Sequence, residues 1–205
     1  MTVFTAAFDQ LPLVAILRGL RPAEAEGIGA ALYDAGFRLI EVPLNSPEPF
    51  DSIARLARSL PADAVLGAGT VLEPDAVARV RDAGGTLIVM PHADTEVIRA
   101  AKAAGMACMP GVATPTEAFA AIRAGADALK LFPAELITPA VVRAMRAVLP
   151  KDIKLLPVGG ITPDNMADFR AAGVAGFGLG SALYKPGMDA ATVAAHAAAF
   201  TNAWK

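Results

Sequence analysis

Two isolated charges interrupt apolar runs of the kind that form buried β-strands. Lys130 lies within residues 128–133, and Glu41 lies within residues 38–44 between branched apolar neighbours. Because side chains alternate along a strand, we expect both charges to point to the face opposite these apolar neighbours. A buried charge is costly unless it is paired, neutralised or wetted by a pocket. The two residues therefore indicate either a structural ion pair or a site of chemistry.

The chemistry that suits this pair is Schiff-base catalysis. A lysine amine in a partly dry site condenses with a ketone, and a nearby carboxylate can carry the protons that condensation and bond cleavage require. Lys130 and Glu41 together therefore favour an aldolase or a decarboxylase. Desolvation would lower the pKa of the lysine and the glutamate charge would raise it, and the sequence leaves open which effect is larger.

Groups that could bind a substrate follow the ends of other apolar runs. Arg18 ends the first run and Thr70 lies at the end of the third, where a guanidinium and a hydroxyl could hold a carboxylate. Each residue also has an ordinary interpretation, as a surface arginine and as a helix cap. Two glycine tracts, residues 158–160 and 178–181, offer backbone N–H groups of the kind that binds phosphate, although glycine also marks ordinary tight turns.

Eight apolar runs rich in Val, Ile and Leu alternate with Ala-rich segments that carry charges at helical spacing. The runs are residues 11–18, 38–44, 64–71, 86–92, 107–113, 128–133, 154–160 and 176–183. The helical patterns begin near Pro22, Pro47, Pro74, Asp94, Pro115, Pro139, Pro163 and Asp189, and residues 1–10 form a helical lead-in. A proline at the first helical position, after a capping residue, is a favourable start for a helix.

This alternation predicts an α/β fold, a single (β/α)8 TIM barrel domain over residues 1–205. Eight strand-plus-helix units without an internal linker favour a parallel sheet that closes and fills its own interior. An open doubly wound sheet is the alternative. Such a fold places a GxGxxG motif after its first strand, and residues 18–21 (RGLR) do not match that motif. In a barrel, chemistry lies at the C-terminal ends of the strands, and the loops after strands seven and eight bind phosphate.

The composition excludes several other classes of function. The chain has 18 Lys+Arg against 20 Asp+Glu and no run of like charge, so neither nucleic acid nor a membrane surface is expected as a partner. No apolar stretch is long enough for a membrane helix, and the N-terminus lacks the features of a secretory signal. The single cysteine, Cys108, cannot form an internal disulfide, which fits a cytoplasmic location.

Metal chemistry has few candidate ligands in this sequence. Glu41 and His92 are the evident ligands at strand ends, fewer than the three that a catalytic zinc site uses. Neither a metal nor another cofactor is therefore expected. His92 could act as an acid or base at the end of the fourth run, but a histidine there is more often a solvated loop residue, and its role stays open.

Seven segments, in order along nearly the whole chain, resemble the class I 2-keto-3-deoxy-6-phosphosugar-acid aldolases. They are residues 17–19 (LRG), 40–47 (IEVPLNSP), 67–72 (GAGTVL), 110–111 (PG), 129–133 (LKLFP), 158–160 (VGG) and 179–184 (LGSALY). The resemblance implies that Lys130 forms the Schiff base and Glu41 is the general acid and base. It also implies a homotrimer, with Arg18 and Thr70 on the pyruvate carboxylate and with the phosphate on Gly159, Gly160, Gly180 and Ser181.

Two branches of this family differ at readable positions. The 6-phosphogluconate branch typically has Thr-Leu-Arg-Thr after the strand-two glutamate and Thr-Gly-Gly after strand seven. Residues 43–46 (PLNS) and 158–160 (VGG) look like the 6-phosphogalactonate branch, and Val158 is the candidate specificity residue. The implied reaction is cleavage of 2-dehydro-3-deoxy-6-phosphogalactonate to pyruvate and D-glyceraldehyde 3-phosphate. The alternative is an enzyme that cleaves the gluconate epimer, or one that cleaves both epimers. A phosphosugar isomerase or a binding barrel is a remote alternative.

Overall fold

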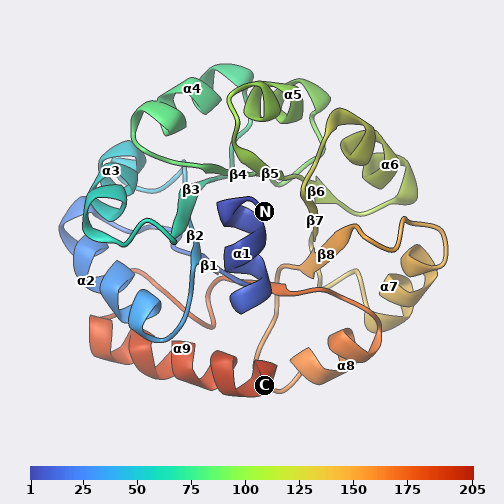
Figure 1. The fold of residues 1–205 in the computed structure, drawn as a ribbon. Helices are drawn as coiled ribbons and strands as arrows, with labels where there is room; N and C mark the ends of the chain where they lie inside the picture. Colours follow the sequence, from blue (N-terminus) through green and yellow to red (C-terminus); the bar gives the residue numbers. More distant parts are fainter.

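The computed structural model describes residues 1–205 and has an α/β fold in which a parallel sheet curls around an apolar interior. Figure 1 shows the strands surrounding helix α1, with helices α2 to α9 outside them. The strands are β1 (Leu13–Ile16), β2 (Leu39–Pro43), β3 (Val65–Gly69), β4 (Leu87–Val89), β5 (Ala107–Met109), β6 (Gly111–Val112), β7 (Ala128–Leu131), β8 (Lys154–Pro157) and β9 (Phe177–Leu179). Each predicted apolar run therefore contains at least one strand, and most strands are shorter than predicted.

The helices alternate with the strands, as the sequence pattern predicts. They are α1 (Val3–Gln10), α2 (Pro22–Asp34), α3 (Pro49–Ser59), α4 (Pro74–Asp82), α5 (Thr95–Ala103), α6 (Pro115–Ala124), α7 (Pro139–Arg146), α8 (Met166–Ala171) and α9 (Ala190–Trp204). None of them is long and apolar enough to cross a lipid bilayer.

The sheet consists of two pieces in which every strand pair is parallel. One piece has six strands in the order β5-β4-β3-β2-β1-β9, and the other has three in the order β6-β7-β8. The fifth predicted run is split at Pro110, because proline has no N–H to donate to a ladder. An isolated parallel bridge between Val158 and Gly178 joins the two pieces beside β8 and β9.

Alternation along the strands separates two apolar layers. The inner layer contains Leu39, Ala128 and ten other buried residues, among them Phe4 and Phe8 of α1. The outer layer packs strand residues such as Ile40, Val42, Leu129 and Leu131 against the helices. Glu41 and Lys130 therefore share the inner side of their strands with Leu39 and Ala128, as the alternation predicts.

Two helices begin later than predicted. The helix expected near Pro47 is α3, which begins at Pro49 after Glu48, a residue with a φ of 42°. The helix expected near Pro163 is α8, which begins only at Met166. The intervening residues form a turn in which the Thr162 N–H donates to Asn165 Oδ1 at 3.1 Å and Asn165 Nδ2 donates to the Gly160 carbonyl at 2.8 Å. Side-chain hydrogen bonds of this kind compete with the first turn of a helix.

Candidate active site

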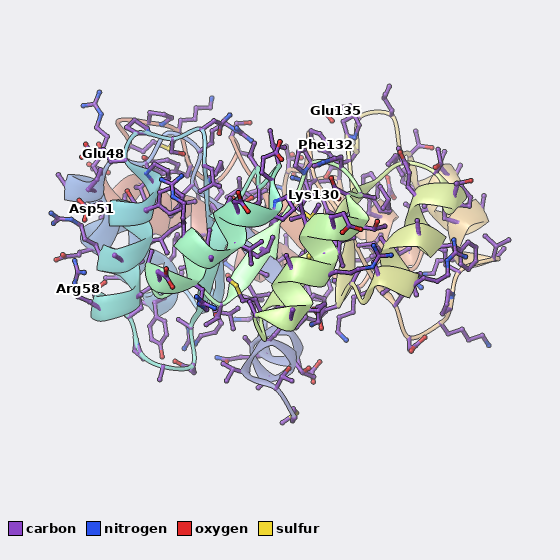
Figure 2. The ribbon with its side chains drawn as sticks, turned by 90° about the horizontal axis from the view of Figure 1, so that it is seen from above. Glu48, Asp51, Arg58, Lys130, Phe132 and Glu135 are labelled. Atoms are coloured by element: carbon purple, nitrogen blue, oxygen red, sulfur yellow. The ribbon has the colours of Figure 1, made fainter.

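A cavity of about 480 Å³ opens at the C-terminal ends of β1, β7, β8 and β9. Figure 2 shows Lys130, Phe132 and Glu135 one above the other on the side away from α1. The cavity is lined by Ile16, Arg18, Gly19, Lys130, Phe132, Glu135, Val158, Gly159, Gly160, Ile161, Thr162, Gly180, Ser181, Ala182, Tyr184, Lys185 and Pro186. Seven of the nine residues predicted for the site line this one cavity, and the other two, Glu41 and Thr70, lie next to it.

Lys130 is the buried cation of the cavity. It lies on β7, its exposed fraction is 6 %, and its Nζ lies 4.7 Å from the centroid of the Phe132 ring. Burial lowers the pKa of Lys130, the Glu41 charge opposes this shift, and the Arg18 charge adds to it. Desolvation is thus the largest of the effects that act on this pKa. A lysine with a lowered pKa holds more neutral amine, which is the nucleophilic form.

Glu41 is the buried carboxylate of the same interior. It lies on β2 with an exposed fraction of 1 %, and its Oε2 accepts no hydrogen bond. Burial raises the pKa of Glu41 to about 7, against the lowering effects of the Lys130 and Arg18 charges. No ion pair joins Glu41 to Lys130 in this structure. A carboxyl group with a pKa near neutrality can both take up and release a proton, as acid–base catalysis requires.

Gly69 creates the space that Glu41 occupies. A Cβ atom at position 69 would lie 1.8 Å from Oε2 of Glu41 and 2.3 Å from its Cδ. No side chain is therefore compatible with the present position of the carboxylate. The third predicted run, residues 64–71, thus contributes to the site in two ways: Gly69 leaves space for Glu41, and Thr70 contributes its hydroxyl.

Arg18 lies at the rim of the cavity, where two side chains orient it. Its Nη1 donates to Asn45 Oδ1 at 2.6 Å, and its Nη2 donates to Thr70 Oγ1 at 3.5 Å. Thr70 has a φ of 54°, an uncommon conformation for a residue with a branched side chain. The guanidinium is exposed and keeps N–H groups free for an anion. Arg18 and Thr70 are thus neighbours, and Asn45 is a partner that the sequence reasoning missed.

The two glycine tracts meet in the wall of the same cavity, where a parallel bridge joins Val158 to Gly178. Gly159 and Gly160 have φ values of 113° and 62°, which favour glycine. The Asn165 side chain fixes the Gly160 carbonyl by the hydrogen bond described above. Gly180 and Ser181 line the same cavity. Backbone N–H groups in such turns form concave sites for anions.

Four polar residues of the cavity were not predicted from the sequence. They are Glu135, Thr162, Tyr184 and Lys185, and all four lie in loops that follow β7, β8 and β9. Their common signal is position, because each comes within seven residues of the end of a strand. In a fold of this type, those loops are where functional groups concentrate.

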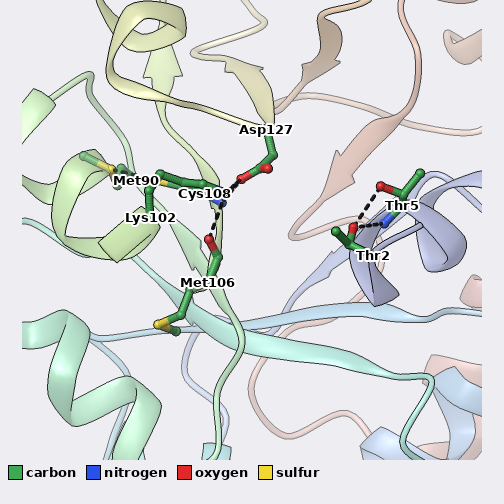
Figure 3. A network of polar contacts seen from close by, with 7 residues as sticks. All are labelled: Thr2, Thr5, Met90, Lys102, Met106, Cys108 and Asp127. Carbon is green, nitrogen blue, oxygen red and sulfur yellow. Dashed lines mark hydrogen bonds and ion pairs between the residues drawn. The ribbon is translucent and has the colours of Figure 1, made fainter. Parts of the chain in front are cut away.

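Several other titratable residues lie outside the cavity. His92 is exposed in the loop after β4 and does not line the cavity. Burial raises the pKa of the Cys108 thiol to about 12, so the thiolate is disfavoured. Figure 3 shows the Cys108 N–H donating at 2.8 Å to Asp127 Oδ2, which also pairs with Lys102 Nζ at 2.6 Å. No three His, Cys, Asp or Glu side chains are grouped so that they could hold a metal ion.

Known proteins resemble this chain over nearly all of its length. A probable 2-dehydro-3-deoxy-6-phosphogalactonate aldolase of Rhizobium meliloti (strain 1021) is 52 % identical over 94 % of this chain and 91 % of its own length. A 2-dehydro-3-deoxy-6-phosphogalactonate aldolase of Escherichia coli (strain K12) is 48 % identical over 96 % of both chains. A solved structure described as native KDPGal superposes with a TM-score of 0.93 at 48 % identity, covering 95 % of each chain.

The family assignment rests on most of the sequence as well as on these relatives. Residues 5–195 match the family described as "Aldolase: KDPG and KHG aldolase". This range contains every residue of the cavity and both buried charges. The chain therefore belongs to the KDPG and KHG aldolase family.

Proposed function

We propose that this protein is a class I aldolase that cleaves 2-dehydro-3-deoxy-6-phosphogalactonate to pyruvate and D-glyceraldehyde 3-phosphate. One observation carries the proposal: Lys130, buried and with a lowered pKa, shares the inner side of the fold with Glu41, a carboxyl group with a pKa of about 7. The names of the two most similar relatives described above support the same reaction.

The reaction begins with the Lys130 amine. Its nitrogen adds to the C2 ketone, and loss of water gives an iminium. The electrons of the breaking C3–C4 bond flow into this iminium, while Glu41, directly or through a water, takes the proton of the C4 hydroxyl. C4 leaves as the aldehyde carbon of glyceraldehyde 3-phosphate, and an enamine remains on Lys130. Glu41 then returns the proton to C3, and water hydrolyses the iminium to release pyruvate and the free amine.

The binding groups orient the substrate between the two ends of the cavity. Arg18 and Thr70 hold the carboxylate next to C2, because the Arg18 charge lies close enough to Lys130 and Glu41 to act on the pKa of both. Gly159, Gly160, Gly180 and Ser181 hold the phosphate at the other end. Lys185 lines the same cavity and supplies a positive charge toward the phosphate. No metal or other cofactor takes part in this mechanism.

We infer that the two pieces of sheet act as one eight-unit barrel and that residues 1–205 form a single domain. Two contacts support this, the Val158–Gly178 bridge and a 3.0 Å hydrogen bond from the Asp127 N–H to the Cys108 carbonyl.

A homotrimer is the assembly that the family resemblance implies, and light scattering on the purified protein would test it. The cytoplasmic location expected from the single cysteine stays a prediction.

Val158 is our candidate for the residue that distinguishes the two C4 epimers. It lies at the end of β8 in the cavity wall, and its Cγ2 packs against Gly178, where an added Cβ would approach it to 2.6 Å. An apolar side chain offers no hydrogen bond to the C4 hydroxyl, and apolar walls discriminate by only about 10- to 200-fold per small group. We therefore expect a preference for the galactonate epimer, with measurable cleavage of the gluconate epimer.

Steady-state kcat/KM values for both epimers test this function. The wild type should prefer the galactonate epimer, and Val158→Thr, which keeps the shape of the side chain and adds a hydroxyl, should shift the ratio toward the gluconate epimer. A wild type that prefers the gluconate epimer would make this protein a 2-dehydro-3-deoxy-6-phosphogluconate aldolase. An unchanged ratio in the variant would show that Val158 does not discriminate.

Two remote alternatives predict a different outcome for Lys130. A phosphosugar isomerase would use the phosphate loops and Glu41 without a covalent lysine intermediate, and a binding barrel would need neither charge for turnover. Neither alternative explains why the fold buries Lys130 on the inner side of β7. Covalent trapping of pyruvate on Lys130, described at the end of the Discussion, separates them from the aldolase.

A further inference from the structure

The side chain of Glu135 lies directly over the glycine turn at the phosphate end of the cavity. A Cβ atom at Gly159 would lie 2.3 Å from Oε2 of Glu135, and one at Gly160 would lie 3.3 Å from its Cγ. Both positions therefore favour glycine for two reasons: a larger residue would crowd the Glu135 side chain, and the backbone has a positive φ. Figure 2 shows Glu135 at the outer end of the column that begins with Lys130 and continues with Phe132.

Backbone hydrogen bonds hold Glu135 in this place. The Ala134 N–H donates to the Val158 carbonyl at 2.9 Å, which ties the loop after β7 to the end of β8. The Leu136 N–H donates to the Pro133 carbonyl at 3.0 Å and closes a turn around Glu135. These bonds place the backbone of Glu135, an exposed residue, at the same strand ends that form the cavity.

The charge of Glu135 has no partner in the protein. Its carboxylate accepts no hydrogen bond and forms no ion pair, although Arg18, Lys130 and Lys185 line the same cavity. Glu135 is also the one carboxylate among the lining residues. A negative charge therefore lies at the place where our proposed function puts the phosphate of the substrate.

We propose that Glu135 sets the affinity of the phosphate end by repelling the bound phosphate group. This inference rests on the proposed function, because it needs the phosphate to lie at the glycine turn. Like charges a few ångströms apart in a wetted cavity weaken binding on the order of tenfold, and salt screens the effect. A weaker hold on phosphate speeds the departure of a phosphorylated product, which suits a cavity with three cations facing a highly charged substrate.

The opposite role would be a hydrogen bond from a substrate hydroxyl to the Glu135 carboxylate. In that case removal of the charge would weaken binding, since the acceptor would be lost. The unpartnered carboxylate packed on the glycine turn favours repulsion, because a ligand anion held by the N–H groups of that turn must lie beside it. The two roles therefore predict changes of opposite sign.

The test uses Glu135→Gln, which keeps the shape of the side chain and removes its charge. We would measure the dissociation constant of inorganic phosphate by calorimetry and the KM of the phosphorylated substrate. We expect Glu135→Gln to tighten phosphate binding by about tenfold and to lower KM, with the difference from wild type shrinking at high salt. Borohydride trapping of pyruvate, which has no phosphate, should be unchanged.

Glu48→Gln is the matched control. Glu48 is exposed, its carboxylate has no hydrogen-bond partner, and it does not line the cavity. Figure 2 shows it at the left of the view, well apart from Glu135. It should bind phosphate as the wild type does. Phosphate affinity that is unchanged or weaker in Glu135→Gln would overturn the inference. Phosphate binding is measured without turnover, so it does not depend on the proposed reaction. A wild type that binds phosphate but cleaves neither epimer would count against the proposed function. The effect of Glu135→Gln on phosphate binding would still test the inference about Glu135.

Discussion

Gly69 leaves the space that the Glu41 carboxylate occupies, and Gly69→Ala tests whether that position matters. The added Cβ would lie 1.8 Å from Oε2, whereas ordinary contacts begin at 3.4 Å. The carboxylate would have to withdraw by about 1.5 Å, and a misplacement of about 1 Å in an active site can lower the rate about 10²-fold. Gly69 does not have a positive φ, so alanine can adopt its backbone conformation. We therefore expect kcat to fall by about 10²-fold.

The assay is the steady-state release of pyruvate from the phosphorylated substrate, with thermal unfolding as a check on the fold. The matched control is Gly27→Ala in α2, where an added Cβ would meet nothing within 4 Å. This variant should keep the wild-type kcat. A Gly69→Ala protein that is folded and has the wild-type kcat would refute the reasoning that Glu41 acts from its present position.

Three further predictions concern Glu41 and metals. Glu41→Gln should lower kcat by roughly 10²- to 10⁴-fold in the same assay while some Schiff base with pyruvate still forms, and an unchanged kcat would return Glu41 to a structural role. Because burial raises the pKa of Glu41 from 4.5 to about 7, its proton stabilises the fold below pH 4.5, and this stabilisation is lost as the pH rises through about 7. Denaturant unfolding should show the wild type losing on the order of 3 kcal/mol relative to Glu41→Gln across that range, and parallel curves would contradict the raised pKa. Activity should survive prolonged dialysis against EDTA, and a loss restored by a divalent ion would favour a metal-dependent aldolase.

The strand residues of the site could be predicted because strand geometry is regular. Lys130 and Glu41 are lone charges in apolar runs, and a period of two is enough to place both on the inner side. The same regularity puts Arg18 and the glycine tracts at strand ends that meet in one cavity. These inferences need no knowledge of distant contacts.

The loop residues could not be predicted in the same way, because their positions depend on tertiary contacts. Glu135 reaches the glycine turn through the hydrogen bond between Ala134 and Val158, which joins residues far apart in sequence. The late start of α8 depends on the Asn165 side chain, which binds Gly160 instead of allowing a helix at Pro163. The break at Pro110 has a local cause, and the missing N–H of proline could have predicted it.

The Schiff base on Lys130 is tested most directly by reduction with borohydride in the presence of pyruvate, followed by peptide mass spectrometry. The wild type should gain a reduced pyruvate adduct on the peptide that contains Lys130, and Lys130→Met should gain none and lose turnover. An adduct on a different lysine such as Lys185, or cleavage activity that persists in Lys130→Met, would contradict a Schiff-base mechanism at this residue.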